Sequence, residues 1–159
     1  MRITAVLPVL LSAFVSPTLW AAHGPASLCA PLRAFAASVQ KDQTKSIEFH
    51  TSWLADFKDG NPKAIGAFTR CFDQGYAPAH AVCSYLSNNG AVEFAGNNAK
   101  QALVCLLPGT RFGQHALTFD ALDVSFYFGT PQRGSNMTIR FRPDPKMGGM
   151  VLTIFARGY

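Results

Sequence analysis

The chain has 159 residues and a formal net charge of +5, and only 14% of its residues are charged, against about 25% in average usage. This length is that of a single domain with one hydrophobic core. The basic excess is mild, whereas nucleic-acid-binding proteins usually concentrate a stronger one. We therefore expect no nucleic acid among the partners.

The N-terminus has the order of features found in a signal peptide. Arg2 supplies a positive charge, an apolar run follows over residues 3–15, and small residues follow at Ala21 and Ala22. The alternative is a membrane-spanning anchor. An anchor needs about 20 apolar residues, and this run is shorter and contains Pro8. The pattern therefore predicts a signal peptide over residues 1–22.

We place the cleavage of this signal after Ala22, with a cut after Ala26 as the alternative. The remaining residues, 23–159, are expected to form a single globular domain. Because the chain would be exported, we expect a periplasmic or secreted protein with no stable membrane insertion.

Four cysteines follow the predicted signal. An even number in an exported chain predicts two disulfides rather than free thiols. Of the three possible pairings we favour Cys29–Cys105 with Cys71–Cys83, and the main alternative is Cys29–Cys71 with Cys83–Cys105. A zinc site built from His80 and cysteines has suitable ligand types, but an oxidising compartment disfavours it. We therefore expect neither a metal nor another cofactor.

Apolar residues that recur every three or four positions predict four helices. Ser27, Asn61 and Asn98 are residue types that cap helix N-termini, and each stands just before or at the start of such a run. The predicted helices span residues 28–40, Asn61 to Gly75, Pro78 to Asn89, and Asn98 to Leu107.

Alternation of apolar and polar residues predicts four strands. The first spans residues 46–53 and places Glu48, His50 and Ser52 on its polar face. The others span residues 122–128, 137–142 and 150–157. Because most helices precede most strands, we predict an α+β fold in which N-terminal helices pack on one face of a three- to four-stranded antiparallel sheet.

No set of side chains meets the geometric needs of catalysis. Successive members of the Glu48, His50 and Ser52 series would lie about 6.5–7 Å apart on a strand, whereas a nucleophile and its base must come within about 2.6–3.2 Å. Asp120 and Asp123 have neither the separation across a cleft that a glycosidase requires nor the oxygen ligands of a calcium loop. We assign no catalytic residue and expect the polar face of strand 46–53 to be solvated.

The outward face of the C-terminal strands combines cations with aromatic rings. If Met137, Ile139 and Phe141 face the helices, the residues between them face away. Guanidinium groups beside aromatic rings suit acidic or planar groups. The alternative is an ordinary solvated surface. The candidate partner-binding residues are Tyr127, Arg140, Arg142, Phe155 and Arg157.

No motif identifies a family or an enzyme class. We expect a small exported binding protein, such as an inhibitor or immunity-type partner of another envelope or secreted protein, or a protein that binds an acidic ligand. The alternatives are a hydrolase of an envelope glycan or peptide that uses His50 and Glu48, and a structural envelope component.

A cleft in which His50 meets a second titratable group would favour the enzyme. A flat sheet face with exposed Tyr127 and Phe155 would favour the binding protein.

Overall fold

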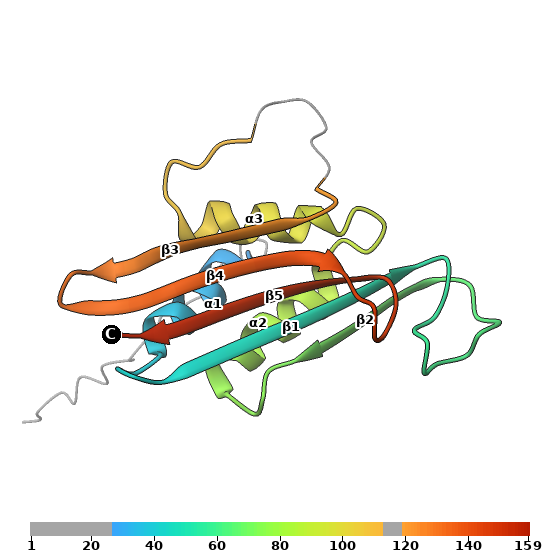
Figure 1. Ribbon diagram of the computed structural model, residues 1–159, viewed down its shortest axis with the longest axis horizontal. Helices are drawn as coiled ribbons and strands as arrows, with labels where there is room; N and C mark the ends of the chain where they lie inside the picture. The colour runs from blue at the N-terminus through green and yellow to red at the C-terminus, as the bar shows by residue number, and fades with distance from the viewer. Residues whose placement is uncertain (1–26, 113–118) are drawn as a thin grey trace, which may run out of the picture.

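The computed structural model describes residues 27–112 and 119–159, which form three helices and five strands (Figure 1). The predicted signal peptide lies outside these residues. Within them, no helix has both the length and the apolar composition needed to cross a membrane. The elements are α1 (Cys29–Ser38), β1 (Thr44–Trp53), β2 (Ala67–Phe72), α2 (Ala77–Asn89), α3 (Gly96–Leu106), β3 (Leu122–Thr130), β4 (Arg133–Pro143) and β5 (Met150–Gly158).

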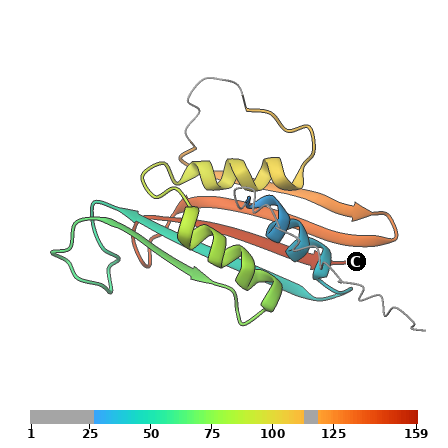
Figure 2. The same cartoon turned by 180° about the vertical axis from the view of Figure 1, so that it is seen from behind.

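The strands form one antiparallel sheet in the order β2-β1-β5-β4-β3. Figures 1 and 2 show that all three helices lie across one face of this sheet and leave the other uncovered by helices. We call the second face the outer face. The core fills the space between helices and sheet, where Phe35, Leu86 and Ile154 are fully buried. The predicted α+β fold is confirmed.

The strand register confirms the predicted alternation of the C-terminal strands. Met137, Ile139 and Phe141 are buried in the core beneath the helices. Side chains of directly paired residues lie on the same face of a sheet, and alternate residues lie on opposite faces. The predicted partner-binding residues therefore lie on the outer face.

Both favoured disulfides are present, Cys29–Cys105 and Cys71–Cys83. The first joins α1 to α3, and the second joins β2 to α2. The alternative pairing is excluded. No cysteine thiolate remains for the zinc site considered above, since all four cysteines are bonded.

The predicted helix from Asn61 to Gly75 is wrong. Asn61 accepts a hydrogen bond from the backbone N–H of Lys63 through its side chain and from that of Ala64 through its carbonyl, so it begins a single turn. Residues 67–72 then form β2 and pair with β1. Cys71 lies within this strand, and its disulfide holds the strand against α2. Cross-strand pairing and the covalent link thus prevail over local helix signals.

Two predicted helix caps are also wrong. The N-cap position of α1 is Leu28, without a side-chain cap, so Ser27 does not serve as the cap. The last helix begins at Gly96, two residues before the expected cap. Asn98 is instead buried inside that helix, where its amide bonds both the N–H and the carbonyl of Ala91.

Candidate functional site

Strand β1 places His50 on the outer face, as its alternation predicts. The expectation of a solvated strand face is wrong, however, because His50 and Ser52 are only 5% and 6% exposed. The loop between β4 and β5 covers this end of the face. It is tied to the long β1–β2 connection by Lys58, whose backbone N–H donates to the carbonyl of Met147 at 2.8 Å and whose Nζ donates to that of Pro145 at 2.7 Å.

Asp144 organises that loop. Its Oδ1 accepts hydrogen bonds from the backbone N–H groups of Lys146 and Met147 at 2.9 and 3.1 Å. The loop closes with Gly148 and Gly149, both at positive φ (85° and 69°). A Cβ on Gly149 would lie 2.1 Å from the carbonyl oxygen of Thr51 in β1, so only glycine allows the loop to lie this close to the strand. These contacts fix the direction of the Asp144 carboxylate.

The second oxygen of Asp144 bonds His50. Oδ2 lies 2.7 Å from Nδ1 of His50, and both side chains are buried. Burial raises the pKa of Asp144, but the hydrogen bonds from Met147, Lys146 and His50 outweigh burial and hold the pKa below its usual value. The carboxylate is therefore ionised and accepts, which means that Nδ1 of His50 carries a proton and donates.

The other ring nitrogen of His50 is unsatisfied. Within the described residues, Nε2 is buried and has no hydrogen-bond partner. Oε2 of Glu48 lies 3.5 Å away, which is longer than an ordinary hydrogen bond. The hydroxyl of Ser52 donates instead to the carbonyl of Ala55 at 2.6 Å. Glu48, His50 and Ser52 therefore do not assemble into a nucleophile–base pair.

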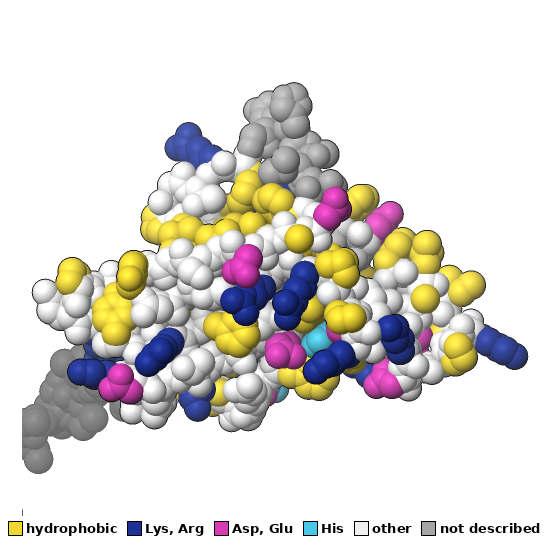
Figure 3. Space-filling model, in the orientation of Figure 1, with side chains coloured by type: hydrophobic (Ala, Val, Ile, Leu, Met, Phe, Trp, Pro, Cys, Tyr) yellow, Lys and Arg dark blue, Asp and Glu magenta, His cyan; other side chains and the backbone are white. Residues whose placement is uncertain are grey.

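A hollow of about 480 Å³ opens beside His50. We call it the histidine pocket and define it by six of its lining residues, Glu48, His50, Phe72, Arg142, Asp144 and Lys146. The rings of His50 and Phe72 form a T-shaped pair, with centroids 5.3 Å apart and an angle of 83° between the ring planes. Arg142 and Lys146 are exposed, and neither forms an ion pair with another described residue. Figure 3 shows Lys and Arg side chains gathered around a histidine on this face.

The middle of the outer face is occupied by paired groups. Arg140 donates from Nε to Asp123 at 2.9 Å, and its guanidinium carbon lies 5.7 Å from the centre of the Phe155 ring. Phe155 is half-buried. Arg140 and Phe155 thus lie where the alternation predicts, but they already contact each other.

The opposite end of the outer face is open. Tyr127 of β3 and Arg157 of β5 both pair with Asn136 of β4, so they flank it. Tyr127 is 77% exposed, and its ring contacts that of Tyr159 with centroids 6.1 Å apart. We call Tyr127, Arg157 and Tyr159 the tyrosine end.

A larger hollow, about 770 Å³, lies away from the histidine pocket. Its lining is mostly apolar and includes Trp53, Phe94 and Met150, with Lys100 among its few charged residues. A hollow of this composition suits the apolar part of a small ligand. It contains neither a titratable pair within hydrogen-bond distance nor an unpartnered buried polar atom among the described residues.

Sequence reasoning found Arg142, Tyr127 and Arg157. It missed Tyr159 at the tyrosine end, and Asp144, Lys146 and Phe72 at the histidine pocket. The sequence pattern identifies residues 143–149 only as the connection between the predicted strands 137–142 and 150–157. An acidic residue between Pro143 and Pro145, in a loop that connects two strands, is a weak signal of a fixed carboxylate. Nothing local could indicate its partner, because 94 positions separate Asp144 from His50.

Comparison with known proteins returned no similar family profile, curated protein or solved structure. Within residues 27–112 and 119–159, no three His, Cys, Asp or Glu side chains are grouped so as to hold a metal ion. The function has to be inferred from the outer face itself.

Proposed function

We propose that this chain is a small exported binding protein that recognises an acidic surface of another exported protein through its outer face. The observation that carries the proposal is the pattern of exposed cations on a face that no helix covers. Arg142 and Lys146 lie at one end, and Arg157 lies at the other, where it and Tyr127 flank Asn136. Two disulfides are typical of oxidising compartments and agree with export to the periplasm or the medium.

The chemistry of this face suits protein recognition. Tyr and Arg are enriched at protein interfaces, because they combine a large contact area with directional hydrogen bonds. Arg142 and Arg157 form no ion pairs within the described residues, so a partner's carboxylates would not have to compete with an internal anion. Complementary charge of this kind accelerates association and selects acidic partners.

The test uses substitutions at the tyrosine end. We expect Tyr127→Ala combined with Arg157→Glu to weaken binding of the natural partner at least about tenfold, which corresponds to about 1.4 kcal/mol. The loss should be larger at low salt, where charges are screened least. The partner is isolated by native co-purification from the exported fraction, and its affinity is then measured with purified proteins.

The matched control is Phe94→Ala combined with Lys100→Glu, which removes an aromatic ring and reverses a positive charge at the larger hollow. Its affinity for the partner should equal that of the wild type. A tenfold loss in the control together with full affinity in the tyrosine-end variant would move the binding site to the larger hollow.

One observation favours a second function, that of a hydrolase acting on an envelope glycan or peptide. The Asp144 carboxylate holds the imidazole of His50 at 2.7 Å, an arrangement that in hydrolases orients the base. The measurement is release of soluble fragments from isolated envelope polymers by the wild type and by His50→Gln. We expect no release by either protein. Release that His50→Gln abolishes would favour the hydrolase.

A further inference from the structure

The Nε2 atom of His50 is a buried polar atom without a partner in the described part of the chain. The whole residue is only 5% exposed, and its other nitrogen is held by Asp144. A buried polar atom without a partner loses its hydrogen bonds to water and gains none in the protein, and such atoms are rare enough in folded proteins to require an explanation. A ligand that completes the hydrogen bonding of His50 would be one.

Glu48 indicates what kind of group fits at Nε2. Its carboxylate oxygen lies nearest along the same strand, 3.5 Å from Nε2, and so approaches without bonding. Its side chain is 47% exposed, so it can turn toward solvent without losing a buried contact. A carboxylate from a bound partner can therefore occupy the space next to Nε2 of His50, beside the Glu48 carboxylate.

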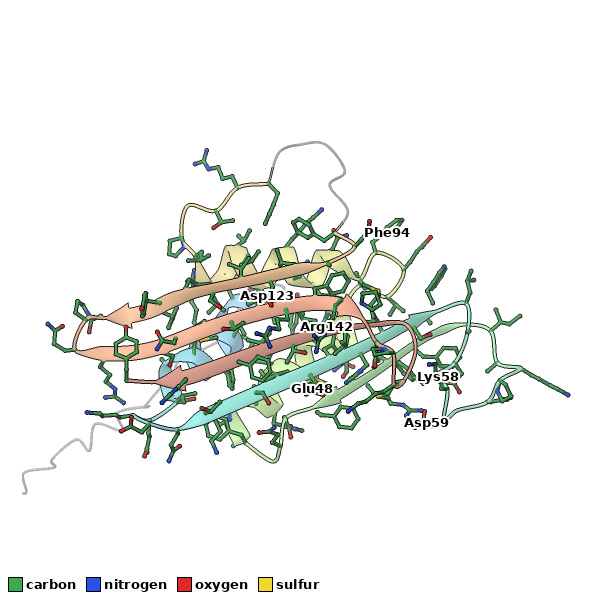
Figure 4. The ribbon with its side chains drawn as sticks, viewed as in Figure 1. Glu48, Lys58, Asp59, Phe94, Asp123 and Arg142 are labelled. Carbon is green, nitrogen blue, oxygen red and sulfur yellow. A yellow bond between two sulfur atoms is a disulfide. The ribbon has the colours of Figure 1, made fainter. Side chains whose placement is uncertain are left out.

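Arg142 lies across the pocket from His50. Arg142 pairs with Val151, and Val151 pairs with His50, so the two residues stand two strand spacings apart, about 9–10 Å between backbones, on the same face. Figure 4 shows Glu48 and Arg142 projecting from this face. A carboxylate above Val151 is within reach of both side chains, and a guanidinium binds carboxylates in a two-pronged geometry.

We propose that the histidine pocket binds a carboxylate of the partner protein, from an Asp or Glu side chain, between the guanidinium of Arg142 and the Nε2–H of His50, with Glu48 turned outward. This inference rests on the proposed function, since it names the group that an acidic partner inserts. Lys146 at the rim adds attraction for the same anion.

The hydrogen bond to Asp144 determines which protons His50 needs in order to bind a carboxylate. Nδ1–H is donated to Asp144, so Nε2 can donate to a carboxylate only when the imidazole carries both protons. The charged groups facing it are Glu48, Asp144, Arg142 and Lys146, together with Arg70 of β2, which is paired with Asp59. A carboxylate bound between Arg142 and His50 therefore requires a proton on Nε2 as well as on Nδ1.

The experiment titrates the exported chain, labelled with ¹⁵N, with sodium acetate at constant ionic strength and reads the ring nitrogens of His50 by NMR. We expect a saturable shift of Nε2, with Nδ1 still bonded to Asp144. Arg142→Gln should weaken acetate binding about tenfold, as loss of a charged hydrogen bond does. Glu48→Gln should strengthen it severalfold by removing a competing anion. Lys63→Gln, a change at an exposed cation outside the pocket, should have no effect.

Acetamide and methyl phosphate complete the test. Acetamide has the shape of acetate without its charge and should not saturate the site. Three results would overturn the proposal. The first is saturation by methyl phosphate but not by acetate. The others are a Nε2 shift that stays linear in acetate concentration and a saturable shift that Arg142→Gln does not weaken. Loss of acetate binding with intact partner binding refutes this inference alone. Saturable acetate binding refutes the proposed function instead if the partner affinity is unchanged by the tyrosine-end substitutions and falls tenfold in the Phe94→Ala, Lys100→Glu control.

Discussion

The two ends of the outer face present cations in different ways. At the histidine pocket, the β4–β5 loop fixes His50 through Asp144, and Asp144 itself is held by two backbone N–H groups. At the tyrosine end, Tyr127 and Arg157 are held by strand register and a contact between rings. One end is a preorganised site, and the other is a set of exposed side chains.

This difference suggests different roles for the two ends: the histidine pocket provides specificity, and the tyrosine end provides contact area. Groups that are already fixed lose little entropy on binding, so a preorganised site converts more of its interaction energy into affinity. Exposed tyrosines supply a large contact area and adapt to the partner. We therefore expect substitutions at the histidine pocket to change both stability and ligand choice, and substitutions at the tyrosine end to change affinity alone.

The largest effect on stability should come from Asp144→Ala. It removes the acceptor of a buried, charge-assisted hydrogen bond and two loop hydrogen bonds, and should lower the free energy of unfolding by about 1.5–3 kcal/mol. Urea denaturation measures it. The control is Asp123→Ala, which breaks the exposed pair with Arg140 and should cost at most about 1 kcal/mol. Equal losses in the two variants would mean that the pocket is no more ordered than the rest of the face.

Low pH should remove the stability that Asp144 contributes at the histidine pocket. The pKa of Asp144 is held below its usual value in the folded protein, so its contribution to stability is present above the unfolded pKa, near 3.9, and disappears as the pH falls through the folded pKa. The difference in unfolding free energy between wild type and Asp144→Ala should therefore be full at pH 7 and shrink progressively as the pH falls below about 3.9. A difference that persists unchanged at pH 3 would contradict the assignment of Asp144 as an ionised acceptor.

The smallest effect on stability should come from the tyrosine end. Tyr127→Ala and Arg157→Glu change exposed side chains, and each should alter the free energy of unfolding by no more than about 0.5 kcal/mol. Urea denaturation of the double variant checks this, and also checks that its loss of partner affinity is not due to unfolding. A loss of more than about 2 kcal/mol would show that these side chains support the fold.

Much of the fold could be predicted because its signals are local. The alternation of Met137, Ile139 and Phe141 with polar residues sets both the strand and its buried face, and the structure confirms both. The β2 segment could not be predicted in this way. Asn61 followed by Pro62 begins a turn as readily as a helix, and pairing with β1 together with the Cys71–Cys83 disulfide decides the outcome.

In the candidate site, too, local features could be predicted and long-range ones could not. Tyr127, Arg142 and Arg157 follow from the period of a strand, so their face was predictable. The burial of His50 was not, because a distant loop covers it and Asp144 reaches it across 94 positions. A pattern along one strand shows which way a side chain points, but it does not show what folds over that side chain.

Hydroxyl-radical footprinting of the protein alone and in complex with its partner tests the central claim most directly. Tyr127 on the outer face and Phe94 at the larger hollow are both exposed aromatic residues, 77% and 58%, so each is oxidised readily in the protein alone. We predict that the partner protects Tyr127 and leaves the oxidation of Phe94 unchanged. Protection of Phe94 with undiminished oxidation of Tyr127 would contradict the assignment of the outer face as the binding surface.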